Sequence, residues 1–176
     1  MTCAISPVLV TPPTEYPVSV EEAKAQLRVT TDADDLMIEA MIETATQSLD
    51  GPNGALGRCI MPQMWRFDLD QFGTAIYLPF GDVMEIDAIT YTDADGVGQT
   101  VSSAAYVARK RGMRWSIELA PTYSWPTSFA TADDVVQATV LMGMDTVPAG
   151  IKQAILLMVG HLYSTAKAEQ GLKDRK

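Results

Sequence analysis

The chain has 176 residues, of which 47% are hydrophobic and 20% are charged, and its formal net charge is −9. This composition fits one folded domain with an inserted lobe, and it excludes a disordered chain, which would contain fewer hydrophobic residues. The acidic balance also excludes tight coating of nucleic acid, because such binding depends on lysine and arginine neutralising phosphates.

Residues 1–18 are predicted to form an extended arm that lies on a neighbouring subunit. Four prolines, at positions 7, 12, 13 and 17, each lack an amide donor and fix their own backbone. The segment has no basic stretch followed by a long apolar run, so no secretory signal is expected. The most apolar window of the chain, residues 151–162, is too short to span a membrane and contains Lys152 and His161.

Two helices are predicted within residues 19–50. Ser19 and Glu22 have the spacing of a capping box, so the first helix is expected to begin at Ser19. The second helix is expected to be capped by Thr31 or Asp32. Its apolar residues recur at helical spacing on one face, whereas Glu39, Glu43 and Gln47 fall largely on the other. The apolar positions are Ile38, Met41, Ile42, Ala45 and Leu49.

Residues 51–147 are predicted to form an inserted, mainly antiparallel β-rich lobe. Trp65, Phe67 and Leu69 alternate with polar residues, which is typical of a strand with one buried face. Further strands are expected over 75–78, 83–91, 106–109, 116–119 and 135–142, because β-branched and aromatic residues are frequent there. Residues 93–96, with the sequence Asp-Ala-Asp-Gly, are expected to form a turn.

The last predicted element is a helix over residues 148–170, followed by a flexible tail over 171–176 that begins at Gly171. Its wide apolar stripe predicts that the helix is central in the fold or packs against another subunit. The expected fold class is α+β: an amphipathic helical bundle with the β-rich lobe inserted between its helices. Leu156 adds apolar surface on the other face of this helix. The residues assigned to the core or to a subunit interface are Ile151, Ile155, Leu156, Met158, Val159, Leu162 and Tyr163.

No catalytic, cofactor-binding or metal-binding residue is predicted. His161 is the single histidine, and no nucleophile motif accompanies it. The carboxylates at 32, 34 and 35 are interpreted as favourable charge at a helix N-terminus. Asp93 and Asp95 resemble the start of a calcium loop, but the twelfth position is Ala104 rather than a glutamate.

The cations at 109, 110, 111 and 114 form a local basic cluster beside Trp115. Because alternate strand residues point to opposite faces, we expect this cluster to be split or held at a hairpin tip, as a solvated surface or a subunit contact. Weak contact with a DNA backbone is the alternative. Cys3 and Cys59 have neither a metal-site nor a redox spacing, and no disulfide is expected.

Three segments together resemble one known family: YPVSVEEAKAQLRV, then DADDLMIEAMIETATQSLDG, and late in the chain VPAGIKQAILLMVGHLY. Their order, from about Pro17 to Tyr163, is similar to that of the head-tail connector, or adaptor, proteins of long-tailed double-stranded DNA phages and gene transfer agents. Gln26 stands where relatives often have histidine, and Ser164, Thr165 and Ala166 replace a more polar ending. These departures concern subunit contacts rather than the helical core.

The resemblance implies a structural protein of the virion neck, made in the host cytoplasm, with no enzyme activity and no cofactor. It implies a homo-oligomeric ring of about twelve copies that docks on the portal protein and receives the stopper or tail-completion protein. DNA would pass through the lumen without tight binding. Portal contact is assigned to Leu172, Lys173, Arg175 and Lys176. The alternatives are another neck or tail-completion subunit, or a small metal-dependent or ligand-binding enzyme using the carboxylates at 32–35.

Overall fold

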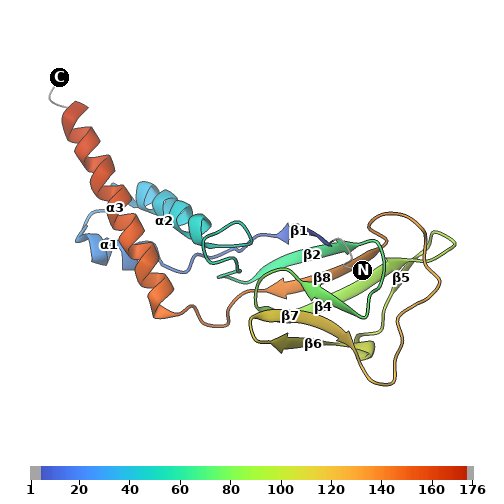
Figure 1. Ribbon diagram of the computed structural model, residues 1–176. Coiled ribbons are helices and arrows are strands. Elements are labelled where there is room, and N and C mark those ends of the chain that lie inside the picture. Colours follow the sequence, from blue (N-terminus) through green and yellow to red (C-terminus); the bar gives the residue numbers. More distant parts are fainter. Residues whose placement is uncertain (1–4, 174–176) are drawn as a thin grey trace. The chain divides into compact units, whose positions relative to one another are not determined.

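The computed structural model describes the backbone of residues 5–173 and the side chains of residues 5–170 (Figure 1). The described chain divides into two compact units, which we call the β unit (5–13 and 62–145) and the helical unit (14–61 and 146–173). The lobe therefore begins later than the predicted residue 51. Residues 51–61 belong with the helices because the Asp50 carboxylate accepts a hydrogen bond from the Ile60 amide at 2.6 Å, and Ile60 is fully buried.

The helical unit begins with α1 (Val20–Leu27), and its predicted capping box is confirmed. The Ser19 hydroxyl accepts a hydrogen bond from the Glu22 amide at 3.1 Å, and the Glu22 carboxylate accepts one from the Ser19 amide at 3.0 Å. Arg28 ends the helix in the left-handed conformation, with φ of 58°. These local bonds satisfy backbone groups that a short helix would otherwise leave to water.

The second helix, α2, spans Asp35–Leu49 and begins later than predicted. Its N-cap is Asp34, so the expectation of a cap at Thr31 or Asp32 is wrong. The reason is that the Asp32 carboxylate accepts a hydrogen bond from Lys24 at 2.6 Å, which holds this side chain on α1 and away from the free amides of α2. The preceding residues form a turn instead.

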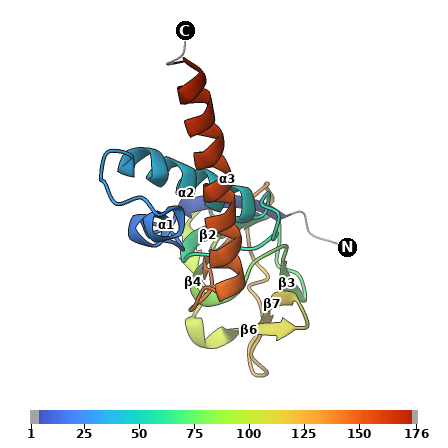
Figure 2. The same ribbon diagram turned by 90° about the vertical axis from the view of Figure 1, so that its left-hand side faces the viewer.

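The third helix, α3, spans Ala149–Lys173 and contacts both α1 and α2. It continues past the ends of the two shorter helices (Figures 1 and 2). The helix runs through Gly171, where the sequence pattern predicts an end and the start of a tail. A glycine inside a helix costs only about 1 kcal/mol relative to alanine, and the flanking residues of the helix are good helix formers.

The core of the helical unit is small and aliphatic. It joins all three helices and the segment before α1, which shows that the end of the predicted arm is part of the core. Met41 and Leu49 pack against it at its margin. Its buried members are Val18, Ala23, Ile38, Ile42, Ala45, Ile155 and Val159.

The β unit contains a five-stranded antiparallel sheet with the order β1-β2-β8-β4-β5. The strands are β1 (Ile5–Thr11), β2 (Gln63–Leu69), β4 (Val83–Thr92), β5 (Gly98–Thr100) and β8 (Val136–Met142). In the central strand β8, buried and half-buried residues alternate, so one face of the sheet is covered. The predicted turn between β4 and β5 is confirmed: the Asp93 carboxylate accepts hydrogen bonds from the amides of Asp95 and Val97 at 3.0 and 2.9 Å.

The extended N-terminal segment is a strand of the chain's own sheet, whereas the sequence predicts an arm on a neighbour. β1 pairs with β2, with Pro7 opposite Phe67. A proline is tolerated here because β1 is an edge strand, where one row of backbone groups needs no partner. Residues 6–11 of β1 are exposed.

A second, three-stranded sheet has the order β3-β7-β6, formed by β3 (Ala75–Leu78), β6 (Tyr106–Arg111) and β7 (Arg114–Leu119), with a short 3-10 helix, η1 (Ser103–Ala105), before β6. Ile76 and Ile117 lie opposite each other and are buried. Phe80, which follows β3, contacts the rings of Trp65 and Phe67 at centroid distances of 4.9 and 5.7 Å. Aromatic packing thus connects this segment to β2 in the larger sheet. Among the described residues, no helix has the length and apolar character needed to cross a membrane.

Candidate interaction surfaces

The carboxylates at the start of α2 are bound to lysines. Lys24 of α1 lies 2.6 Å from Asp32 and 2.8 Å from Asp35, and hydrogen bonds to these two carboxylates raise the pKa of Lys24. The interpretation of these acids as helix-capping charges is therefore incomplete, because their partners come from another helix. No group of three or more His, Cys, Asp or Glu residues with metal-site geometry occurs in the described part of the chain.

Asp34 connects α2 to α3. Its carboxylate accepts hydrogen bonds from the Tyr163 hydroxyl at 2.7 Å and from Lys167 at 3.0 Å. The bond from Lys167, and then the bond from Tyr163, lowers the pKa of Asp34. The same contact raises the pKa of Tyr163, because the negative carboxylate opposes ionisation of the phenol. This cluster therefore joins the N-terminus of α2 to the C-terminal half of α3.

A groove runs between α2 and α3 on the surface of the helical unit. Its floor and walls are largely apolar, with Met41 from α2 and Leu162 from α3, and His161 lies on its rim and is exposed. The His161 carbonyl accepts bonds from the Ser164 and Thr165 hydroxyls at 2.9 and 3.0 Å, as is common within helices. Such a surface suits binding of an apolar segment. The full lining is Met37, Ala40, Met41, Thr44, His161, Leu162, Thr165, Ala166 and Glu169.

The predicted stripe of α3 is divided between the core and the surface. Ile155 and Val159 are fully buried, whereas Ile151, Leu156, Met158 and Tyr163 are partly buried against the core, and Leu162 lines the groove. On the other side of the helix, Leu157 is 60% exposed. The side chains of the tail residues assigned to the portal, Leu172, Lys173, Arg175 and Lys176, lie outside the described residues.

The basic cluster is split across the β6–β7 hairpin, as predicted. Lys110 points to one face, where it lies 2.6 Å from Asp82 and above the Trp115 ring at 5.3 Å. Arg111 points to the other face, where it lies 3.0 Å from Glu118. Gly112, with φ of 66°, makes the tight turn between the two strands. The turn residue Met113 is 80% exposed.

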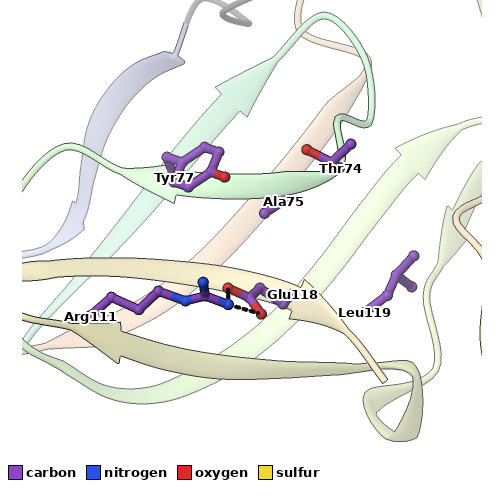
Figure 3. A pocket seen from close by; sticks show the side chains of 6 residues that line it. All are labelled: Thr74, Ala75, Tyr77, Arg111, Glu118 and Leu119. Carbon is purple, nitrogen blue, oxygen red and sulfur yellow. Dashed lines mark hydrogen bonds and ion pairs between the residues drawn. The ribbon is translucent and has the colours of Figure 1, made fainter. Parts of the chain in front are cut away.

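The outer face of the small sheet carries a shallow pocket that combines an aromatic ring with an ion pair. Figure 3 shows Tyr77 from β3 on one side of it, with Arg111 of β6 and Glu118 of β7 joined on the other. Tyr77 is 61% exposed. The hydroxyl of Ser116 also donates to Glu118, at 3.1 Å. This mixture of an exposed ring and paired charges is common at protein interfaces.

Two of these surfaces were missed by sequence reasoning. The α2 wall of the groove contains Met37 and Thr44, one turn to either side of Met41, and this helical spacing was a usable signal. The sequence contains no comparable signal for the pocket at Tyr77. Its residues are distant in sequence and are brought together only by the pairing of β3 with β7.

No family model matches the chain, and neither does any curated protein. The fold, however, matches chains of solved gene transfer agent particles. A chain in the neck of an empty GTA particle, computed with C6 symmetry, has a TM-score of 0.70 and 21% identity, covering 92% of this chain and 84% of that one. A chain in the virion of a native gene transfer agent particle has a TM-score of 0.67 and 22% identity, covering 91% and 84%.

A third match is to a chain in the neck of a native GTA particle computed with C12 symmetry, with a TM-score of 0.58 and 19% identity over 92% of this chain and 83% of that chain. Two of these structures are of particle necks and one is of a whole virion, and their fold agrees with the resemblance read from the sequence. The chain has the fold of gene transfer agent neck and virion chains.

Proposed function

We propose that this protein is a structural subunit of the virion neck, where copies of it form a ring that joins the DNA-filled capsid to the tail. The observation that carries the proposal is the fold shared with a GTA neck chain at a TM-score of 0.70 over 92% of the sequence. The neck structures computed with C6 and C12 symmetry support a ring. The protein acts through its shape, and we assign it no catalytic step and no cofactor.

The surfaces of the helical unit suit such a ring. In a cyclic assembly, each subunit contacts its two neighbours through different patches, so apolar surface is expected on more than one side. The groove between α2 and α3 is one such patch, and Leu157 lies on another side of α3. Leu36, at the start of α2, is 84% exposed. In an isolated subunit these apolar side chains would be exposed to water. Contacts with neighbouring subunits in a ring would bury them.

We further propose that the portal protein binds the C-terminal segment with Leu172, Lys173, Arg175 and Lys176. The described part of α3 runs to Lys173 and past the shorter helices, so its last described turn lies away from the core (Figure 2). Truncation after Ala168 is expected to abolish portal binding in a copurification assay. The matched control replaces only the three cations by glutamine, which separates loss of charge from loss of helix. Undiminished binding by the truncated chain would contradict the assignment.

The same proposal places the protein in the neck of the finished particle and in the host cytoplasm before assembly, with the stopper or tail-completion protein on the side opposite the portal. DNA passes through the ring lumen, and the net charge of −9 keeps it from binding tightly. The alternative within the neck is a different completion subunit, which would copurify with tail proteins and fail to bind the portal.

The decisive experiment deletes the gene in a producer strain and images the particles by electron microscopy. Filled capsids without tails are expected, together with free tails, and expression of the intact chain in trans should restore joined particles. Capsids that still join their tails without this protein would rule out the proposed role. Imaging of restored particles with labelled protein should place the label at the neck.

A further inference from the structure

The positive charge of the β unit is concentrated in one hairpin. Residues 62–145 contain five lysines and arginines, and four of them lie in residues 109–114. The fifth, Arg66, is paired with Asp68 at 2.7 Å. The same range contains eleven aspartates and glutamates. The β unit is therefore an acidic body with a single basic projection, the β6–β7 hairpin.

The tip of this hairpin lies at one end of the larger sheet. Lys110 and the Trp115 ring nitrogen both contact the Asp82 carboxylate, at 2.6 and 3.2 Å. Asp82 directly precedes Val83, which opens β4 and pairs with Met142 at the end of β8. The hairpin tip therefore marks the end of the sheet at which β4 begins and β8 finishes.

Carboxylates gather at the opposite end of the same sheet, which we call the acidic end. Leu69, Val136 and Tyr91 lie in register across β2, β8 and β4. The residues just beyond them include five aspartates, and the Asp134 amide donates to the Asp70 carboxylate at 3.2 Å. The ten residues of β4 separate the two ends by roughly 30 Å. The acidic end consists of Asp70, Asp93, Asp95, Asp133 and Asp134.

The chemistry of the tip favours a protein partner over nucleic acid. Arg109, Lys110 and Arg111 are each within ion-pair distance of a carboxylate of the same chain, so phosphates would have to compete for them. Met113 is 80% exposed beside them, and Tyr77 is 61% exposed. Arginine, methionine and tyrosine are the residue types enriched at protein interfaces. Among the described residues, Arg114 has no ion pair, which leaves it available to a partner's carboxylate.

We propose that the β6–β7 hairpin tip of one copy docks on the acidic end of the next copy in the ring, an inference that rests on the proposed function. The two surfaces are complementary in charge, and they lie at opposite ends of one unit. A contact between two different patches repeats from copy to copy, which is the arrangement that closes a ring. The occupant of the acidic end is thus a second copy of this chain.

A charge exchange tests the contact in assembled particles. One variant carries Met113→Glu and Arg114→Glu, and a second carries Asp95→Arg and Asp133→Arg. All four side chains are exposed, and none has a side-chain bond within the described chain. A third variant combines all four substitutions. Each purified chain is first checked for an unchanged thermal unfolding midpoint, and the amount of chain per capsid protein is then measured in purified particles.

Each charge reversal alone is expected to lower the amount of chain in particles by about tenfold or more, because like charges across an interface are strongly unfavourable. The combined variant is expected to recover to within about twofold of the wild type, because its tip and its acidic end attract again. Full incorporation of either single reversal would overturn the proposal. A combined variant incorporated into particles no better than either charge-reversal variant would also overturn it. That outcome would assign the hairpin to DNA or to another neck protein.

A cross-linking measurement covers the case in which a reversed chain does not fold. Met113→Cys and Asp133→Cys in one chain, treated with a bismaleimide in assembled particles, should give a ladder of linked copies, and either cysteine alone should give none. Particles that contain the chain but give no ladder would overturn the hairpin contact while leaving the neck function standing. Particles that join heads to tails without the chain would instead remove the proposed function.

Discussion

Ile155 on α3 gives the most direct test of how the helical unit is held together. Its side chain is fully buried among residues of all three helices. Ile155→Ala removes three carbons at about 0.8 kcal/mol each, and the unfilled cavity adds about 1 kcal/mol or more, so we expect a loss of roughly 3–4 kcal/mol in the free energy of unfolding. Leu157→Ala, two residues along the same helix, removes the same number of carbons from a side chain that is 60% exposed and should cost about 1 kcal/mol or less.

Urea unfolding followed by circular dichroism at 222 nm measures this difference, because the helices dominate that signal. Trp65, Trp115 and Trp125 all belong to the β unit, so tryptophan fluorescence follows that unit separately in the same samples. Ile155→Val is a graded control and should cost about 1 kcal/mol. Equal losses for Ile155→Ala and Leu157→Ala would refute the assignment of Ile155 to the core, as would a loss below about 1 kcal/mol for Ile155→Ala.

Three further predictions concern local features of the helical unit. The pKa of Asp34 is lowered from the ordinary aspartate value of 3.8. The contribution of Asp34 to stability is therefore complete above pH 3.8 and is lost as the pH falls through the lowered pKa. The unfolding midpoint of Asp34→Asn should accordingly be less sensitive to acid than that of the wild type. Ser19→Ala removes the cap of α1 and should cost about 1 kcal/mol in urea unfolding, and no loss would contradict the capping role. Gly54→Ala would place its Cβ against the backbone of residues 49 and 50 and should cost at least about 2–3 kcal/mol, whereas Gly57→Ala meets open space and should cost only the roughly 1–2 kcal/mol of a left-handed alanine.

Much of the fold could be predicted from local pattern. Alternation of buried residues along β8 and over residues 63–67 of β2, the capping box at Ser19 and the turn at Asp93 each depend on neighbours within a few residues. Such features are determined by steric preference and by short-range hydrogen bonds, which are the same wherever the segment lies in the fold. The strand and helix positions were therefore largely correct.

The errors occurred where a partner distant in sequence decided the structure. The prolines predict an extended arm over residues 1–18. Residues 5–11 instead form an edge strand paired with β2, and Val18 is buried in the core of the helical unit. The N-cap of α2 is Asp34 rather than Thr31 or Asp32, because Lys24 binds the carboxylate of Asp32. Neither partner is visible in a local window, because both contacts form only when separate elements meet.

The candidate surfaces divide in the same way. The sequence by itself determined the acidic net charge, the apolar stripe of α3 and the concentration of cations at 109–114, since these depend only on which residues are present and at what spacing. Only the tertiary structure decided that five aspartates from three separate segments meet at one end of a sheet, with the basic hairpin at the other. Charge polarity of this kind is set by strand register, and register is a property of the paired sheet rather than of any single strand.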